Sequence, residues 1–485
     1  MKTNSLSPKT WRIMDRGRTW LAAIAGFVLL SSACIPTLPH GKARAPNTGV
    51  PSSYGGPADA TNSAQMKWNE FFTDPKLNAL IDTALKNNQE LNIVSLEVDI
   101  SQNEVMARRG EYLPKVGFRV GAGIEKVGQY TSQGASDDAN GVPVHLPDFG
   151  LGFTASWEID IWSKLRNATK AATLRYLGSK EGRNFAVTRL VGELSNSYYE
   201  LLALDAQLDV VQQNIAIQTS ALTVVRLRKE AAKVTELAVK RFEAEVLKNQ
   251  SRQYTIQQQI VEAENRINFL LGRFPQRVDR SAQRFVELVP PVVHSGIPSQ
   301  LLDNRPDVKQ AQLELVAAEL DVKVAKAGFY PSLGLNANIG IQSFDFLKLV
   351  SLPASLVYGI AADLVGPLFN RKALTATYFT SNSKQMQAVY HYERAILNGY
   401  TEVIKLLAMI HNLEKSYDLQ VQQVDKLTQS IDISSQLFAS ARADYMEVLL
   451  TRRDALEAQM DLIENKKQQM TAAVGLYQAL GGGWR

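Results

Sequence analysis

Cysteine is almost absent from this chain, since Cys34 is the only one in 485 residues. A lone cysteine cannot build a disulfide framework or a cysteine-rich zinc site. The five histidines are scattered and show no spacing typical of a metal site. No phosphate-binding loop and no serine or cysteine nucleophile motif is present. We therefore predict that the protein is not an enzyme and has no cofactor and no metal.

The sequence also lacks a strong excess of charge of either sign. Its 53 lysines and arginines are interspersed with 48 aspartates and glutamates. A nucleic-acid-binding protein usually gathers basic residues into a patch or a stripe. We therefore expect no nucleic-acid partner.

Long apolar runs are confined to the N-terminus. A basic segment precedes the apolar run Trp20–Leu30, which is typical of a secretion signal. The run ends at Ser31-Ser32-Ala33-Cys34, which resembles a bacterial lipobox, so we predict a lipoprotein signal peptide over residues 1–33 and lipidation of Cys34. The alternative is an ordinary signal peptide with an incidental cysteine. The following residues are rich in proline, glycine and serine, and we interpret residues 34–70 as a lipid-anchored tether.

Proline is missing from two long stretches, Ile161–Phe274 and Leu368 to the C-terminus. Apolar residues recur there at spacings of three and four, the pattern of packed long helices. A helix from Trp162 to Lys229 would be about 100 Å long. The pattern breaks near Ala231–Thr235 and Ala439–Tyr445, where we expect the chain to turn back.

Two glutamines, Gln218 and Gln420, interrupt the apolar seams of these helices. We expect both to be solvated or to face a lumen; the alternative is a functional role. Neither outcome changes the prediction of long helices.

Four shorter segments each carry apolar residues at every second position, and in the first three the residues between them are polar, charged or small. They cover residues 115–126, 149–160, 332–342 and 356–365. Each has about the 9–11 residues that a tilted strand needs to cross a bilayer, with one apolar face. Four strands are too few to close a barrel, and an open edge leaves backbone groups unpaired in hydrocarbon. If these are membrane strands, several chains must therefore share one barrel.

The chain is internally duplicated. Asn87, Pro114 and Gly117 correspond at one constant offset to Asn304, Pro331 and Gly334. Such a long repeat indicates two copies of one structural unit. We place the first repeat at residues 71–275, a linker at 276–297 and the second repeat at 298–485.

Three motifs carry a resemblance to a known family. They are Trp157–Trp162 followed by Lys164-Leu165-Arg166, Gly296–Ser299 followed by Arg305-Pro306-Asp307, and Tyr445–Leu449. With these motifs the chain resembles the TolC/OprM-type outer-membrane efflux channels, and specifically their lipoprotein (NodT) branch.

The resemblance implies a mixed α and β membrane protein. Three chains would each give four strands to a shared twelve-stranded transmembrane β-barrel, and their long helices would form a periplasmic α-helical barrel. The homotrimer would lie in the Gram-negative outer membrane, anchored in its lipid through Cys34.

The function implied is a passive exit duct for small molecules in a tripartite efflux system. A periplasmic adaptor and an inner-membrane transporter of the RND type would be its partners. Two alternatives remain open: an outer-membrane duct for one-step protein secretion, and a periplasmic coiled-coil adaptor lipoprotein without a pore.

The resemblance also places a gate at the periplasmic helix ends. Glu447 stands where the family has an acidic residue, but Leu450 and Ala238 replace aspartates that are usual there. We expect a thin acidic ring and a closure that depends equally on packing. The candidate gate residues are Glu447, Tyr445, Asp444, Arg442 and Glu236. The alternative is that Glu447 pairs with a neighbouring arginine and Tyr445 only packs between helices.

Overall fold

The computed structural model describes residues 35–39, 41–55, 61–281, 285–369, 371–440 and 442–485. Cys34 and the signal segment before it lie outside the described residues. Among the helices in the described part, none is both long enough and apolar enough to cross a membrane.

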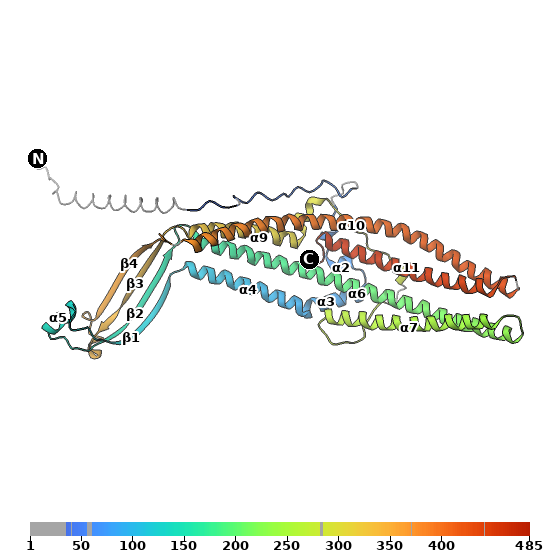
Figure 1. Ribbon diagram of the computed structural model, residues 1–485, viewed down its shortest axis with the longest axis horizontal. Coiled ribbons are helices and arrows are strands. Elements are labelled where there is room, and N and C mark those ends of the chain that lie inside the picture. Colours follow the sequence, from blue (N-terminus) through green and yellow to red (C-terminus); the bar gives the residue numbers. More distant parts are fainter. Residues whose placement is uncertain (1–34, 40, 56–60, 282–284, 370, 441) are drawn as a thin grey trace. The chain divides into compact units, whose positions relative to one another are not determined.

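The order of elements repeats once along the chain (Figure 1). The first series is α4 (Gln89–Tyr112), β1 (Lys115–Glu125), α5 (Ser132–Ala139), β2 (Leu146–Ile159), α6 (Lys164–Glu230) and α7 (Glu236–Leu270). The second is α9 (Pro306–Ala327), β3 (Ser332–Ser343), β4 (Leu356–Val365), α10 (Lys372–Ala439) and α11 (Tyr445–Ala479). Shorter elements are η1 (Ser63–Gln65), α2 (Trp68–Phe71), α3 (Pro75–Asn87), η2 (Phe285–Glu287), η3 (Pro298–Gln300), α8 (Leu301–Asn304) and η4 (Phe346–Lys348). The predicted duplication is confirmed.

Both long helices turn back where the sequence pattern breaks. Helix α6 ends at Glu230 and α7 begins at Glu236, with the Thr235 side chain accepting a hydrogen bond from the backbone N–H of Ala238. Such an N-cap satisfies one of the unpaired donors of the new helix. Helix α10 ends at Ala439 and α11 begins at Tyr445. Both predicted turns are confirmed.

The strands form one antiparallel sheet in the order β1-β2-β3-β4. Its register aligns the apolar residues of all four strands in rows on one face. One row contains Phe118, Phe153, Ile339 and Tyr358, and the next contains Val120, Leu151, Ile341 and Leu356. The first row is more than half exposed in the single chain. This face therefore presents an apolar band that the described residues leave exposed.

The opposite face of the sheet is polar or small. One of its rows contains Gly117, Thr154, Asn338 and Gly359, and its neighbour contains Arg119, Gly152, Gly340 and Val357. A membrane strand with lipid on one side and water on the other shows this division.

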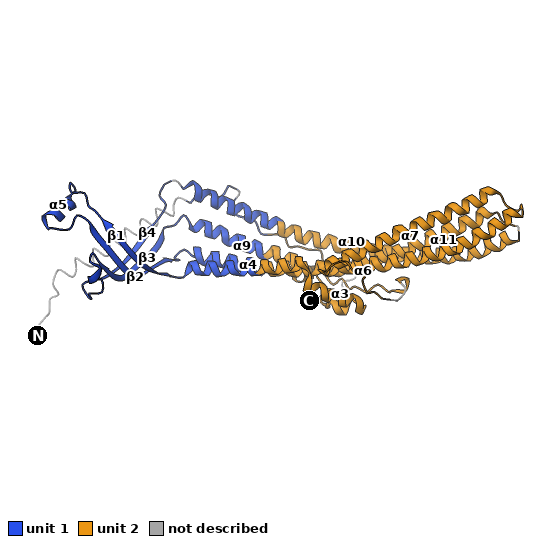
Figure 2. Cartoon of the chain, turned by 90° about the horizontal axis from the view of Figure 1, so that it is seen from below, with its two compact units in different colours: residues 1–45, 99–177, 313–390 blue, residues 46–98, 178–312, 391–485 orange. Residues whose placement is uncertain are grey.

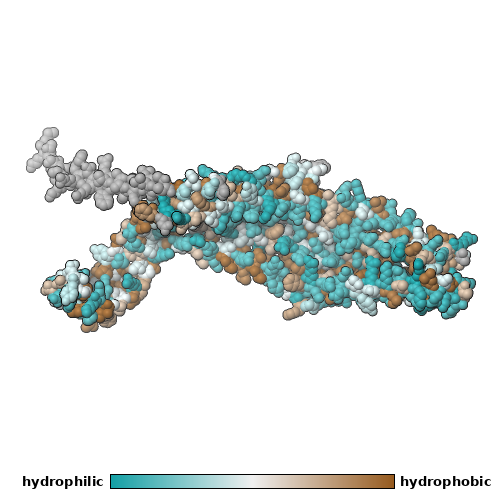
Figure 3. Space-filling view, in the orientation of Figure 1, coloured by the Kyte–Doolittle hydropathy of each residue, from teal (hydrophilic) through white to brown (hydrophobic). Residues whose placement is uncertain are grey.

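The contacts of the chain divide it into two compact units (Figure 2). The first consists of residues 1–45, 99–177 and 313–390 and contains the sheet. The second consists of residues 46–98, 178–312 and 391–485 and contains the main apolar core. In that core the rings of Phe71 and Tyr477 stack 4.0 Å apart, and the Tyr477 hydroxyl donates to the Met66 carbonyl. The visible face of the long helices is mostly hydrophilic (Figure 3).

The segment before α2 lies along α10 through successive contacts. Within the first unit the Asn382 amide donates to the Gly41 carbonyl. Within the second, the Tyr400 hydroxyl donates to the Ser53 carbonyl, and the Tyr54 ring stacks on Tyr400 at 5.6 Å. This extended segment has no core of its own.

One detail differs from the expectations. Gln218 is not solvated: it is 1% exposed, and its side-chain oxygen accepts a hydrogen bond of 2.8 Å from Asn249 on α7. The connection from β1 to β2 contains α5, whose first turn is capped by the Thr131 side chain.

Candidate functional site

The candidate gate residues lie around the start of α11 and the start of α7. Asp444 immediately precedes α11, and its carbonyl accepts from the backbone N–H of Glu447. Glu447 lies in the first turn with an exposed side chain, whereas Tyr445 is half-buried. Arg442 lies in the connection from α10 with its side chain exposed.

Tyr445 and Met446 pack against a small apolar cluster at the ends of the helices, which we call the tip cluster. Its buried members are Leu222, Val225, Ala238, Val239, Phe242, Val246 and Leu449. These residues come from α6, α7 and α11, so the two helical hairpins of one chain share a core at this end.

Two arginines link the same hairpins. Arg228 on α6 donates to the Phe438 carbonyl on α10 at 3.1 Å, and its guanidinium lies 4.3 Å from the centre of the Phe438 ring. Cation–π contacts of this kind contribute about 0.5–2 kcal/mol. Arg241 on α7 donates to the Met446 sulfur on α11 at 3.3 Å.

Glu236 is paired within its own hairpin. Lys229 lies 2.8 Å from one of its carboxylate oxygens and Lys240 lies 3.7 Å from the other. The hydrogen bond from Lys229, followed by the charges of the two lysines, lowers the pKa of Glu236. Its charge is therefore largely compensated, and it adds little to an acidic ring.

Glu447 differs from Glu236. Within the described part of the chain its carboxylate forms no ion pair, whereas the alternative from the sequence pairs it with a neighbouring arginine. Arg453, further along α11, pairs with Asp454. The carboxylate of Glu447 remains available to face a pore or a neighbouring subunit.

The motif Arg305-Pro306-Asp307 is a buried ion-pair cluster in the second unit. The Arg305 guanidinium, 7% exposed, bonds to Asp307 and Glu402 at 2.9 Å and to the Ala479 carbonyl at 2.6 Å. A Cβ atom on Gly399 would come within 3.1 Å of the Arg305 side chain, so the glycine leaves room for it. Pro306 opens α9, where its missing N–H costs no hydrogen bond.

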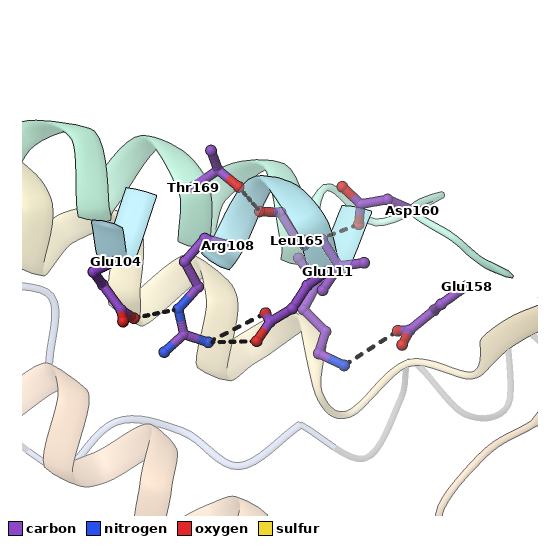
Figure 4. A network of polar contacts seen from close by, with 8 residues as sticks. Glu104, Arg108, Glu111, Glu158, Asp160, Leu165 and Thr169 are labelled. Atoms are coloured by element: carbon purple, nitrogen blue, oxygen red, sulfur yellow. Dashed lines mark hydrogen bonds and ion pairs between the residues drawn. The ribbon is translucent and has the colours of Figure 1, made fainter. Parts of the chain in front are cut away.

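The junction between β2 and α6 is held by carboxylates (Figure 4). Asp160 accepts hydrogen bonds from the backbone N–H groups of Leu165 and Arg166, which caps α6. Glu158 pairs with Lys164 at 3.2 Å. The motif that begins at Trp157 thus fixes the direction in which α6 leaves the sheet. The same figure shows Arg108 on α4 paired with Glu104 and Glu111.

Sequence reasoning missed Arg228, Phe438, Arg241 and Met446. Each is an ordinary helical residue, and its partner lies about two hundred positions away in the chain, so local pattern gives no signal. Within the described residues, no group of three or more metal-ligating side chains gathers at this or any other place.

The chain matches a known protein family and is similar to characterised members of it. A family model described as outer membrane efflux protein matches residues 80–273 and 297–482. The pyoverdine export outer membrane protein OpmQ of Pseudomonas aeruginosa is 28% identical over 466 residues, covering 94% of this chain and 96% of that protein. The solvent efflux pump outer membrane protein SrpC of Pseudomonas putida is 26% identical, covering 89% and 91%.

A solved structure shares the fold. The open state of the Neisseria gonorrhoeae MtrE outer membrane channel matches with a TM-score of 0.81 at 21% identity, covering 93% of this chain and 99% of that chain. The duplicated arrangement of strands and long helices is therefore the fold of a known outer membrane channel.

Proposed function

This chain belongs to the outer membrane efflux protein family, and from that premise we propose that it is the passive exit duct of a tripartite efflux system in the Gram-negative outer membrane. Three copies would join their sheets into one twelve-stranded transmembrane barrel. Their helices would continue it as a periplasmic α-helical barrel. The duct carries out no chemistry.

One observation carries this proposal: the sheet has a continuous apolar face and two open edges. The rows through Phe153 and Leu151 align across all four strands, while β1 and β4 each have one neighbour only. In hydrocarbon, unpaired backbone groups at an edge cost several kcal/mol each. Pairing β1 of one copy with β4 of the next removes the edges and places every apolar row against lipid.

We assign the division of the chain accordingly. Residues 1–33 are a lipoprotein signal peptide, residues 34–70 a tether, residues 71–275 and 298–485 the two repeats, and residues 276–297 their linker. In this assignment Cys34 is the lipidated N-terminus of the mature protein. Two or more acyl chains on it would give a stable membrane anchor. Mass spectrometry of the N-terminal peptide tests this assignment, and an unmodified thiol or cleavage elsewhere contradicts it.

The partners follow from the same family. A periplasmic adaptor would bind the helix ends around the tip cluster, and an inner-membrane transporter of the RND type would supply the energy. By their names, the relatives described above export pyoverdine or solvents. We accordingly propose small molecules as the cargo, and we expect the transporter rather than the duct to select among them.

The gate would lie at the tips. Tyr445 seals by packing on the tip cluster, and the unpaired Glu447 of three copies would concentrate negative potential around the axis. Asp444 and Arg442 flank it, while Glu236 is held by its lysines. The gate therefore combines one acidic ring with packed side chains.

Two alternatives are distinguished by experiment. A duct for one-step protein secretion would have the same assembly but a protein cargo. A periplasmic adaptor without a pore would leave the aligned apolar face of the sheet unexplained.

The decisive test uses the full-length lipoprotein purified in mild detergent. We expect a trimer by mass measurement and stepwise conductance after reconstitution into planar bilayers. A cysteine pair linking β1 of one copy to β4 of the next should yield covalent trimers. A monomer without conductance would contradict the duct, and export of a protein but no small molecule would favour the secretion alternative.

A further inference from the structure

We propose that Lys115 and Arg119 form a basic belt on the polar face of the sheet, and that this belt attracts small organic anions bearing carboxylate or phosphate groups as they leave. The inference rests on the proposed function, because it requires the polar face to line the lumen of the barrel.

The belt is defined by the register of the sheet. Lys115 lies in a row with Ser156, Asn336 and Ala361, and Arg119 lies in a row with Gly152, Gly340 and Val357. The row between them and the row after Arg119 contain only glycine, threonine, asparagine and glutamine. Over these rows the polar face therefore has two charges, and both are positive.

The acidic residues of this face lie at its two ends. Glu158 and Asp363 occupy the row before Lys115, while Asp148 and Glu125 lie beyond Gly121. Three of these acids already have partners within the chain. Glu158 pairs with Lys164, Asp363 accepts from the Asn336 amide, and Asp148 accepts from the Gln342 amide.

The basic side chains have no such partners. Neither Lys115 nor Arg119 forms an ion pair with any residue that the structure describes, and both side chains are exposed. An unpaired guanidinium is a strong donor for carboxylates and phosphates because its planar fork can make two parallel hydrogen bonds.

The surroundings of Arg119 keep it accessible. A Cβ atom on Gly152 would lie 2.6 Å from the Ile339 carbonyl oxygen, and one on Gly340 would lie 2.4 Å from the Leu151 carbonyl oxygen. Strands β2 and β3 therefore approach so closely that a side chain at Gly152 or Gly340 would collide with the facing backbone. The result is a shallow hollow of about 320 Å³, whose lining includes glycines, Arg119, Thr154 and Asn338 and, toward one end of the face, Gln342 and the carboxylate residue Asp148.

In a threefold assembly the belt would be repeated three times around the lumen. Its field extends over about 10 Å in 0.1 M salt. Anions would be concentrated at the belt and cations depleted there, between two acidic zones in which Glu158 is ion-paired and Asp363 and Asp148 keep their charge while accepting from neutral amides. The belt would thus favour release of anionic cargo without a tight binding site.

The test measures the local potential directly, independently of the gate. A reporter cysteine is introduced by Thr154→Cys, one row from Arg119 on the same face, in protein reconstituted into liposomes. It is reacted with an anionic sulfonatoethyl or a cationic trimethylammonioethyl methanethiosulfonate, and modification is followed by mass spectrometry. The parent chain gives the background from Cys34, and Phe153→Cys on the apolar face is the control shielded by lipid.

We expect the anionic reagent to be favoured over the cationic one. Adding Arg119→Gln should lower the ratio of the two rates on the order of fivefold, from Coulomb's law in water at about 8 Å. Arg119→Lys should preserve the ratio, Lys115→Gln should lower it, and 1 M salt should abolish the difference.

The outcomes separate the two proposals. If the Thr154→Cys reporter reacts with neither reagent, the polar face does not line a water-filled lumen and the duct itself is contradicted. If it reacts but the ratio is the same with and without Arg119, the duct stands and the basic belt is wrong. An acidic residue of a neighbouring subunit that neutralised Arg119 would give this second result.

Discussion

Asn88 and Arg305 occupy equivalent positions in the two repeats and make the same hydrogen bond. Asn88 donates to the carbonyl of Leu270 at the end of α7, and Arg305 donates to the carbonyl of Ala479 at the end of α11. Asn88 is neutral and Arg305 is charged, yet each connects the C-terminal end of a helix, α7 or α11, to the start of a repeat.

Two glycines next to these contacts are also equivalent in the two repeats. Gly272 and Gly481 both have positive φ, and a Cβ atom on either would lie within about 2.5 Å of a backbone carbonyl oxygen, that of Asn87 or of Asn304. Positive φ and close approach together favour glycine. Both repeats therefore keep the same contact between the end of the returning helix and the start of the repeat.

The charge of Arg305 makes the second contact the more sensitive one. Arg305→Met would remove the buried cation shared by Asp307, Glu402 and the Ala479 carbonyl; because both carboxylates are partly exposed, the cost should be below the value of about 3–5 kcal/mol expected for a fully buried pair. We expect a large fall in the unfolding temperature of the detergent-solubilised protein. Arg175→Met removes an exposed arginine paired with Glu314 and should cost about 0–1 kcal/mol. Equal losses would show that burial of the cluster is not what matters.

The two faces of the sheet should tolerate charge differently. Phe153→Arg or Ile339→Arg places a cation in the apolar rows and should cost about 2–4 kcal/mol near the bilayer midplane. Thr154→Arg and Asn338→Arg lie on the polar face and should assemble. The yield of folded trimer in outer-membrane fractions measures both. Similar defects in the two pairs would mean that the apolar rows do not face lipid.

The gate should open when its packing is loosened. Tyr445→Ala removes a ring from the tip cluster, and Arg228→Ala removes the link to Phe438. We expect both to raise the resting conductance of reconstituted channels and to make cells leaky to antibiotics. Glu447→Ala should mainly reduce cation preference.

An exposed arginine provides the control for this series. Arg108→Ala alters α4 in the other unit, where Arg108 pairs with Glu104, and should leave conductance unchanged. If the tip substitutions behave like Arg108→Ala, the narrowest part of the duct lies elsewhere.

The buried pair Gln218 and Asn249 should determine how α6 and α7 align. Gln218→Leu leaves the Asn249 amide without its hydrogen-bond acceptor, and an unpaired buried polar group costs about 1–3 kcal/mol. Gln218→Leu combined with Asn249→Leu removes both polar groups and should recover most of the loss. A double-mutant cycle of unfolding free energies measures the coupling, and additive losses would show that the hydrogen bond contributes nothing specific.

Local pattern was sufficient for much of the fold. The alternation through Phe153 and Ile339 marks strands because side chains in a strand point to opposite faces in turn. The loss of apolar periodicity near Ala231–Thr235 marks a turn for an equally local reason. The helix α5 was missed because its capping residue, Thr131, lies in a segment too polar and too short to show a period.

Contacts between distant residues could not be read in this way. In the sequence Gln218 interrupts an apolar seam, and only the position of Asn249 on the returning helix makes it a buried partner. Arg228 and Phe438 belong to different repeats, so their contact depends on the packing of two hairpins. The same holds for the Glu447 carboxylate: that it forms no ion pair with the residues the structure describes depends on the three-dimensional arrangement.

The open edges of the sheet also have a genetic consequence. Because β1 and β4 are the edges of the described sheet and would be paired only by neighbouring copies in the proposed barrel, the stability of the membrane form would belong to the assembly rather than to a single chain. One chain with a defective strand would therefore disrupt any trimer that it joins, including its two normal subunits. When such an allele is expressed together with the normal one in equal amounts, random mixing in a threefold ring leaves only about one assembly in eight intact, so strand mutations should be dominant.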